Sequence, residues 1–265
     1  MNILLISTNR NTLPMPVMPI GACMVAEACE RAGHRVMLLD LLFEREPLAA
    51  VRDVVRTFRP DVVGLSVRNI DNNDMRDTVF FLEDLRSIVH AVRGHTAAPV
   101  VLGGAALAVM PEAILRFTGA ALAVLGDGET VFPRVLDRLA AGRSAADVAG
   151  AAVLDRDGYR STPCAGGSID CGAPDYRRWL DVRAYGRQLA TVPLQTKLGC
   201  SFHCVYCTYR KIEGSGHRLA EPARVAEAVV KLASSGLRDI ELVDSVFNAP
   251  YDHARQVCEA LAGVK

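Results

Sequence analysis

The first 140 residues of the chain alternate between short apolar runs and longer amphipathic runs. The short apolar runs, which predict strands, are Ile3–Ser7, Arg35–Asp40, Asp61–Val67, Pro99–Leu102 and Ala121–Leu125. The runs with helical spacing of apolar residues are Ile20–Ala32, Leu48–Phe58, Asp74–Val92, Pro111–Phe117 and Thr130–Ala141. This alternation predicts an α/β fold. We expect residues 1–142 to form a doubly wound, five-stranded parallel sheet, a Rossmann-like domain.

Ligands of such domains bind beyond the carboxyl ends of the strands, where the strand order reverses. The segments that follow strands, and therefore belong to this edge, are Thr8 to Gly21, Ser66 to Asn73, Gly103 to Ala106 and Gly126 to Glu129. Three of these segments contain glycines, which let a backbone approach a ligand closely. The same glycines equally suit ordinary turns, so this domain alone leaves both interpretations open.

The rest of the chain has two further parts. Residues 143–189 are expected to form a hairpin and a linker. The hairpin strands are expected at Ala151–Leu154 and Tyr159–Thr162, and the linker at Cys164 to Pro174. In residues 190–265 the βα pattern resumes. Its strands are expected at Ala190–Thr196 and Asp239–Val243, and its helices at Glu221–Ser234 and Tyr251–Leu261.

Three cysteines cluster directly after the first of these later strands. Cys200, Cys204 and Cys207 have the spacing C-x3-C-x2-C, which lets one compact loop direct three thiolates at a single centre. Thiolates are soft donors that suit iron–sulfur clusters or zinc. Three protein ligands on a [4Fe–4S] cluster leave one iron open, as a catalytic metal site requires.

Three other interpretations of the cysteines compete with the cluster. The first is a zinc site with His203 as the fourth ligand, although His203 directly precedes Cys204 and adjacent residues rarely converge on one ion. The second is a redox pair formed by Cys204 and Cys207. The third is a chance grouping of buried cysteines. The position after a strand, behind Gly199, favours the iron–sulfur cluster.

The cysteines together with Tyr206 resemble the signature of radical S-adenosylmethionine (SAM) enzymes, C-x3-C-x-aromatic-C. The N-terminal part resembles the cobalamin-binding domain that precedes the barrel in the B12-dependent radical SAM group. The features that carry this second likeness are Pro19-Ile20-Gly21, Gly103-Gly104 and Gly126-Asp127-Gly128-Glu129. The resemblance covers nearly the whole chain, and implies that residues 190–265 begin a TIM-like radical SAM barrel.

The resemblance implies three cofactors: a [4Fe–4S] cluster, SAM and cobalamin. In the family, the open iron binds SAM, whose cleavage yields a 5′-deoxyadenosyl radical, and many members then methylate an unreactive carbon. Such chemistry belongs to the cofactors, and the protein positions them. The implied cluster ligands are Cys200, Cys204 and Cys207. Tyr206 is expected near the adenine of SAM, and Asp244 and Ser245 near its polar end, although Asp244 equally suits a loop cap.

The cobalamin contacts implied by the likeness lie at the carboxyl edge of the first sheet. They are Thr8, Gly21, Ser66, Arg68, Asn69, Gly103, Gly104, Gly126, Gly128 and Glu129. The first loop, Ser7 to Gly21, lacks histidine and the motif D-x-H-x-x-G, so we expect no histidine ligand to cobalt from that motif. One hypothesis places Arg68 under the corrin. The alternative is a surface arginine paired with Asp71 or Asp74.

A methyltransferase is the leading expectation. Its rivals are a non-methylating enzyme, for example one that forms rings, and a corrinoid-binding module without catalysis. A methylthiotransferase is less favoured because Cys23 and Cys29 fall within one expected helix. The barrel of the family has more βα units than the two or so found here, which indicates a fragment or a partner that completes the barrel.

The charge balance and the apolar pattern restrict partners and location. Lys plus Arg and Asp plus Glu are 30 each, so nothing indicates a nucleic-acid or anionic membrane surface. No apolar run reaches 18 residues, and the apolar start at Met1–Ile6 is typical of a strand and not of a signal peptide. We expect a cytoplasmic protein whose partners are a small-molecule or peptide substrate and an external electron donor.

Overall fold

The computed structural model describes residues 1–164 and 173–264. The chain divides into two compact units. The N-terminal unit is formed mainly by residues 1–14, 21–164 and 176–180, and the C-terminal unit mainly by residues 181–264. Most of the expected linker, Cys164 to Pro174, lies outside the described residues.

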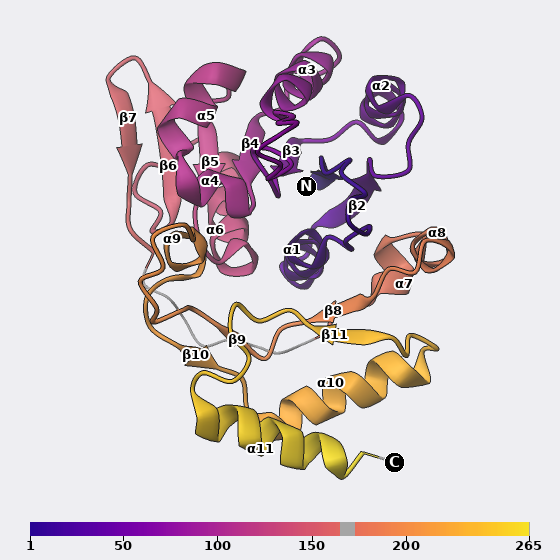
Figure 1. Cartoon of the computed structure of the whole chain (residues 1–265). Coiled ribbons are helices and arrows are strands. Elements are labelled where there is room, and N and C mark those ends of the chain that lie inside the picture. The colour runs from indigo at the N-terminus through magenta and orange to yellow at the C-terminus, as the bar shows by residue number, and fades with distance from the viewer. Residues whose placement is uncertain (165–172, 265) are drawn as a thin grey trace. The chain divides into compact units, whose positions relative to one another are not determined.

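A seven-stranded sheet forms the centre of the N-terminal unit, in the order β2-β1-β3-β4-β5-β6-β7 (Figure 1). The strands are β1 Asn2–Ser7, β2 Arg35–Asp40, β3 Val62–Ser66, β4 Val100–Gly103, β5 Leu122–Val124, β6 Ala151–Asp155 and β7 Gly158–Ser161. The first five are parallel, which confirms the expected Rossmann-like fold. The hairpin β6–β7 continues this sheet, because β6 pairs antiparallel with β5 and covers its otherwise open edge.

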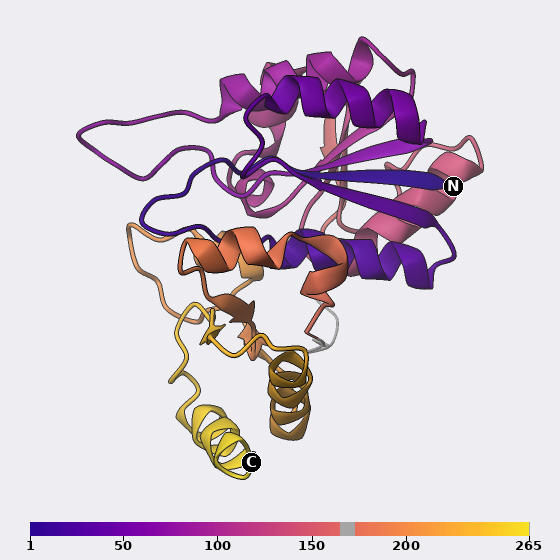
Figure 2. The same ribbon diagram turned by 90° about the vertical axis from the view of Figure 1, so that its right-hand side faces the viewer.

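Helices cover both faces of this sheet. They are α1 Ile20–Arg31, α2 Pro47–Phe58, α3 Leu82–Arg93, α4 Ala105–Val109, α5 Pro111–Thr118, α6 Gly128–Ala140 and the short α7 Tyr176–Trp179. Figure 2 shows α2 and α3 on one face and α1 on the other. Val55, Ile88 and Ile114, from α2, α3 and α5, are buried in one core with the sheet residues Leu65 and Leu102. The apolar stripes seen in the sequence thus face the sheet, as burial of apolar surface favours.

One local expectation in this unit was wrong, and one short helix was not expected. The helix expected over Asp74–Val92 begins only at Leu82. The residues before it form a loop, because side chains of this loop accept hydrogen bonds from the loop's own backbone. Asp71 Oδ1 accepts from Asn73 N at 2.8 Å, and Asp74 Oδ1 accepts from Arg76 N at 2.8 Å. Such local bonds compete with the helical pattern. The unexpected helix is α4, which begins directly after Gly104 and has no apolar periodicity long enough to predict it.

The C-terminal unit contains two successive βα units. Its elements are α8 Val182–Arg187, β8 Val192–Leu194, β9 Lys197–Leu198, α9 Tyr209–Glu213, β10 Arg218–Leu219, α10 Pro222–Ser234, β11 Ile240–Leu242 and α11 Tyr251–Ala262. Strands β8 and β11 are parallel, whereas β9 and β10 form an antiparallel pair. The buried Val225 and Leu232 of α10 and Val257 of α11 lie on the packed faces of these helices.

Two features of the C-terminal unit differ from the expectation. The strand expected over Ala190–Thr196 ends at Leu194, and β9 begins after two intervening residues. Residues 143–189, expected to form only a hairpin and a linker, also contain α8. Its first turn is capped by Asp181 Oδ1, which accepts from Arg183 N at 3.0 Å. Within residues 1–164 and 173–264, no helix has the length and apolar character required to cross a membrane.

Candidate functional site

The strand order of the N-terminal sheet creates a ligand edge between β1 and β3. Because β2 and β3 flank β1 on opposite sides, the chain connections diverge there, and such a switch point is where doubly wound folds bind ligands. Ser7, Ser66 and Gly103 are in register at the ends of β1, β3 and β4. Thr8 donates to the Ser66 carbonyl oxygen twice, from its backbone N at 3.1 Å and from Oγ1 at 3.0 Å. The expected contacts Thr8, Ser66 and Gly103 therefore lie together at this edge.

At Gly104, the loop that follows β4 lies in close backbone contact with the loop that follows β3. Its φ is +96°, and a Cβ there would lie 2.5 Å from the Val67 carbonyl oxygen. Val67 N donates to the Gly103 carbonyl oxygen at 2.8 Å, and Ala106 N donates to the Val67 carbonyl oxygen at 3.1 Å. Only glycine allows this close approach. Gly104 thus has a structural reason of its own, besides any contact with a ligand.

Arg68 and Asn69 follow β3 at the same edge. Arg68 is exposed, and Asn69 is partly buried. In the part of the chain that the structure describes, no ion pair joins Arg68 to Asp71 or Asp74. The carboxylates of both accept backbone N–H groups of their own loop instead. The surface ion pair considered as an alternative for Arg68 is therefore not found among the described residues.

The remaining expected contacts lie at or before the N-termini of α1 and α6, the helices that follow β1 and β5. Gly21 has no heavy atom within 4 Å of a Cβ position, so space is open beside it. At Gly128 a Cβ would lie 2.9 Å from Val25 Cγ2, which explains glycine there by the packing of α6 against α1. Gly126 has a φ of +89°, and Glu129 lies in the first turn of α6. With its polar groups and open backbone, and without a histidine in Ser7 to Gly21, this edge fits a cobalamin that takes no ligand from that loop.

The cysteine loop, residues 199–208, lies between β9 and α9 of the C-terminal unit. Its start is fixed, because Gly199 has a φ of +92° and a Cβ there would lie 1.9 Å from the Gly216 carbonyl oxygen. Cys200 N donates to the Gly214 carbonyl oxygen at 3.1 Å. Cys200 is buried, whereas Cys204 and Cys207 are exposed. Beyond Cys200 the loop is anchored mainly by a turn in which Cys207 N donates to the Cys204 carbonyl oxygen at 3.2 Å.

The three thiols are free, and their donor chemistry fits an iron–sulfur cluster. Within the described ranges, however, no three His, Cys, Asp or Glu side chains are gathered in an arrangement that would hold a metal ion. The cluster ligands thus stay a prediction. His203, the fourth ligand of the zinc alternative, has its Nε2 beside the Arg210 guanidinium, a contact that does not favour metal binding.

Asp244 and Ser245 follow β11 and bind the strand that leads to the cysteine loop. Asp244 Oδ1 accepts from Thr196 N at 2.8 Å and from Lys197 N at 3.2 Å, and Asp244 Oδ2 accepts from Thr196 Oγ1. Both carboxylate oxygens of Asp244 therefore bind Thr196 and Lys197, as expected for a residue that caps a loop. Ser245 Oγ donates to the Gly199 carbonyl oxygen at 3.4 Å. Tyr206 is 86% exposed on the cysteine loop.

Two residues at the base of the loop were missed by the sequence analysis. Glu213 Oε2 accepts from Gly199 N at 3.2 Å, and Oε1 accepts from Gln195 Nε2 at 3.3 Å. Burial raises the pKa of Glu213, while the Gly199 bond and the charge of Lys197 oppose that rise. Lys197 is fully buried, and its Nζ has no hydrogen-bond partner among the described residues. In the sequence both are ordinary charged residues, and no motif marks them.

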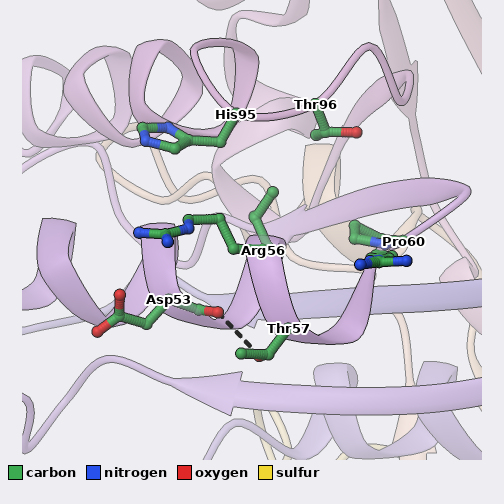
Figure 3. Close-up of a pocket in the computed structure, with 8 residues that line it drawn as sticks. Asp53, Arg56, Thr57, Pro60, His95 and Thr96 are labelled. Carbon is green, nitrogen blue, oxygen red and sulfur yellow. Dashed lines mark hydrogen bonds between the residues drawn. The ribbon is translucent and has the colours of Figure 1, made fainter.

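A separate hollow lies at the opposite edge of the N-terminal sheet, where β3 and β4 begin. It is lined by Asp53, Val55, Arg56, Thr57, Arg59, Pro60, His95 and Thr96, from the end of α2 and the segment after α3 (Figure 3). Thr57 Oγ1 donates to the Asp53 carbonyl oxygen at 2.8 Å. Because it lies at the amino ends of the strands, this hollow is not part of the ligand edge.

Comparisons with known proteins match both units. Residues 6–136 match the B12 binding domain family. The chain is 24% identical to tryptophan 2-C-methyltransferase of Streptomyces laurentii, over 94% of the chain and 50% of that protein. It is 26% identical to hopanoid C-3 methylase of Methylococcus capsulatus, over 92% of the chain and 45% of that protein. It thus spans about half the length of these relatives.

A solved structure supports the same likeness. The radical SAM methyltransferase TsrM of Kitasatospora setae, with cobalamin and a [4Fe–4S] cluster bound, superposes with a TM-score of 0.87 at 26% identity. The superposition covers 97% of this chain and 50% of that chain. The fold of the described chain, including the α/β portion after residue 190, is therefore that of about half of this relative.

Proposed function

Because the chain contains a B12 binding domain and is homologous to cobalamin-dependent radical SAM methyltransferases, we propose that it belongs to an enzyme that methylates an unactivated carbon. The enzyme uses cobalamin, a [4Fe–4S] cluster and SAM. Its substrate is a small molecule or a peptide, and an external donor supplies electrons. The enzyme acts in the cytoplasm, where thiols stay reduced.

The observation that carries this proposal is the order of the two cofactor motifs on matching folds. The B12 binding domain occupies residues 6–136, and the cysteine loop follows β8 and β9 of the next unit. A relative with the same fold over 97% of this chain binds both cobalamin and a [4Fe–4S] cluster, according to its structure. The curated relatives are methyltransferases or methylases, which favours methyl transfer as the reaction.

At the N-terminal unit, the chain's own groups bind and orient the corrin. Thr8, Ser66 and the Gly103 backbone lie at the carboxyl ends of neighbouring strands, where bound cobalamin would contact them. Bound cobalamin would supply the methyl group. Arg68, exposed beside this edge, would lie against bound cobalamin, and its guanidinium, which has no acceptor, would not serve as a metal ligand.

At the C-terminal unit, Cys200, Cys204 and Cys207 would hold the cluster and leave one iron without a protein ligand. The cluster would supply the electron for radical chemistry. Tyr206, exposed on the same loop, would lie near the adenine of bound SAM. Asp244 fixes Thr196 and Lys197, the residues that lead into the loop, and so positions the loop. Ser245, bonded to the Gly199 carbonyl oxygen, lies beside the start of the loop and faces the polar end of SAM.

The test uses the full-length protein that contains this chain, purified without oxygen. Its absorption spectrum should show corrin and iron–sulfur bands together. After reduction with SAM present, 5′-deoxyadenosine or a methylated product is expected. If the protein binds cobalamin but takes up no cluster on reconstitution with iron and sulfide, the chain is a corrinoid-binding module and the enzymatic proposal is wrong. A product without an added methyl group would retain radical chemistry and exclude methyl transfer.

A further inference from the structure

The base of the cysteine loop is held by two consecutive acceptors at the end of α9. Glu213 Oε2 accepts from Gly199 N at 3.2 Å, and the Gly214 carbonyl oxygen accepts from Cys200 N at 3.1 Å. Two adjacent residues thus bind two adjacent N–H groups, and the second of these belongs to a cysteine. The start of the loop is thus joined to the end of α9, the helix that follows the loop.

The Gly199 peptide has little freedom to find another arrangement. With a φ of +92° it occupies a backbone region that favours glycine, and a Cβ there would lie 1.9 Å from the Gly216 carbonyl oxygen. Ser245 Oγ donates to its carbonyl oxygen at 3.4 Å from the other side. Glu213 therefore provides the side-chain acceptor for the N–H group of a peptide that is fixed directly before Cys200.

Keeping a carboxylate at this position has a cost. Glu213 is half-buried, and loss of water disfavours its charged form. The buried ammonium of Lys197 and the Gly199 N–H favour the charged form. A surface glutamate would need no such support. The arrangement is thus explained better by a role at the loop than by solubility of α9.

We propose that Glu213 is a positioning residue, which orders the Gly199–Cys200 start of the cysteine loop so that the Cys200 thiol is in place when the cluster binds. This inference rests on the proposed function, because it presumes that the loop holds a cluster. Outer partners of metal ligands act in this way, by fixing the orientation of the ligands. Glu213 acts through the Gly199 peptide, since its carboxylate accepts from Gly199 N and from Gln195 Nε2.

The test compares Glu213→Ala, Glu213→Gln and a control, Glu241→Ala, in full-length protein reconstituted with iron and sulfide. Glu241 is an exposed glutamate of the same unit, on β11, whose carboxylate accepts from Thr191 Oγ1 and not from the loop. For each variant, the rate of cluster loss to an iron chelator and the EPR spectrum of the reduced cluster are measured. Cobalamin content and thermal unfolding report on the rest of the fold.

Glu213→Ala should lose its cluster about tenfold faster than the wild type and alter the EPR spectrum, since outer partners affect metal affinity by about 10- to 100-fold. Glu213→Gln retains an oxygen that accepts from Gly199 N, and should resemble the wild type in both measurements. Glu241→Ala should also resemble the wild type. All variants should bind cobalamin as the wild type does.

Three results would overturn the inference while leaving the proposed function intact. They are a Glu213→Ala protein with wild-type cluster loss and spectrum, a Glu213→Gln protein as impaired as Glu213→Ala, and a control variant as impaired as either. The second would show that charge matters and not the bond to Gly199. A wild-type protein that takes up no cluster would overturn the proposed function and this inference together.

Discussion

The carboxyl edge of the N-terminal sheet and the cysteine loop of the C-terminal unit are built by opposite means. At the sheet edge, Thr8, Ser66 and Gly103 are far apart in the sequence, and the register of parallel strands brings them together. In the cysteine loop, the candidate ligands lie within eight positions, yet only Cys200 is buried, and its backbone is bonded to Gly214 at the base of the loop. Closeness in the sequence therefore does not by itself produce an ordered site.

The difference follows from where the backbone bonds go. Each strand end at the sheet edge is bonded to a neighbouring strand, so the edge exists as soon as the sheet folds. The loop is bonded at its base, by Glu213, Gly214 and Ser245, and its outer part presents two exposed thiols. Metal ligands in such loops are ordered in part by the metal, and the binding free energy is then coupled to the folding of the loop.

The largest effect expected from this comparison is the loss of a whole cofactor from one unit only. Cys204→Ser or Cys207→Ser should abolish the iron–sulfur absorption after reconstitution, because a hydroxyl is a poor ligand for iron. Cobalamin should bind as before, since the sheet edge does not depend on the loop. The matched control is Cys258→Ser, which replaces an exposed cysteine on α11. If the Cys204→Ser or Cys207→Ser variant also lost cobalamin, the sheet edge and the cysteine loop would not be independent sites.

The next effect compares two glycines, Gly199 in the cysteine loop and Gly104 at the sheet edge, each of which fixes the backbone of its own region. Gly199→Ala places a Cβ 1.9 Å from a carbonyl oxygen, and Gly104→Ala places one at 2.5 Å, both at positive φ. Strain and clash together should cost about 2–5 kcal/mol of unfolding free energy. Gly199→Ala should lower the retention of the cluster and leave cobalamin affinity unchanged. Gly104→Ala should lower cobalamin affinity and leave the retention of the cluster unchanged.

Urea unfolding followed by the absorption of each cofactor measures this pair. Gly158→Ala is the control, because Gly158 also has a positive φ, +108°, but no heavy atom lies within 4 Å of its Cβ position. It should cost only about 1–2 kcal/mol. If both glycine variants lost both cofactors, the two regions would not be independent.

A smaller effect tests whether side chains at the sheet edge contribute to cobalamin binding. Thr8→Val removes the Oγ1 donation to the Ser66 carbonyl oxygen and keeps the bond from Thr8 N. The lost bond should cost about 1 kcal/mol of stability. Cobalamin affinity, measured by titration of the absorption spectrum, should fall as well. A lower melting temperature with unchanged affinity would show that Thr8 serves the fold alone.

The smallest effect concerns Arg68. Because its side chain is exposed, and no ion pair joins it to Asp71 or Asp74 within the described part of the chain, Arg68→Ala should leave the melting temperature unchanged. The absorption spectrum of bound cobalamin should change if Arg68 lies under cobalt. Asp71→Ala, in the same loop, should leave the spectrum as it is. A cobalamin-bound structure with Arg68 far from the corrin would exclude the hypothesis.

The sequence by itself determined the fold class and the position of both candidate sites. Periodicity of apolar residues is a local property, and it predicted five parallel strands and their helices because each stripe must be buried against the sheet. The cysteine spacing is equally local. Resemblance to a family then indicated the cofactors. The family match supports cobalamin binding for residues 6–136, whereas the cluster and SAM stay proposals for the second unit.

Only the tertiary structure decided which groups fix these sites. The bond between Thr8 and Ser66 spans 58 positions, and the bonds of Asp244 to Thr196 and Lys197 span 48 and 47. Three further features also depend on distant parts of the chain: the antiparallel extension of the sheet by β6, the bond between Glu213 and Gly199 N, and the burial of Lys197. Such pairings depend on strand register and on where a loop closes, and these are set by packing between distant segments and not by any local pattern.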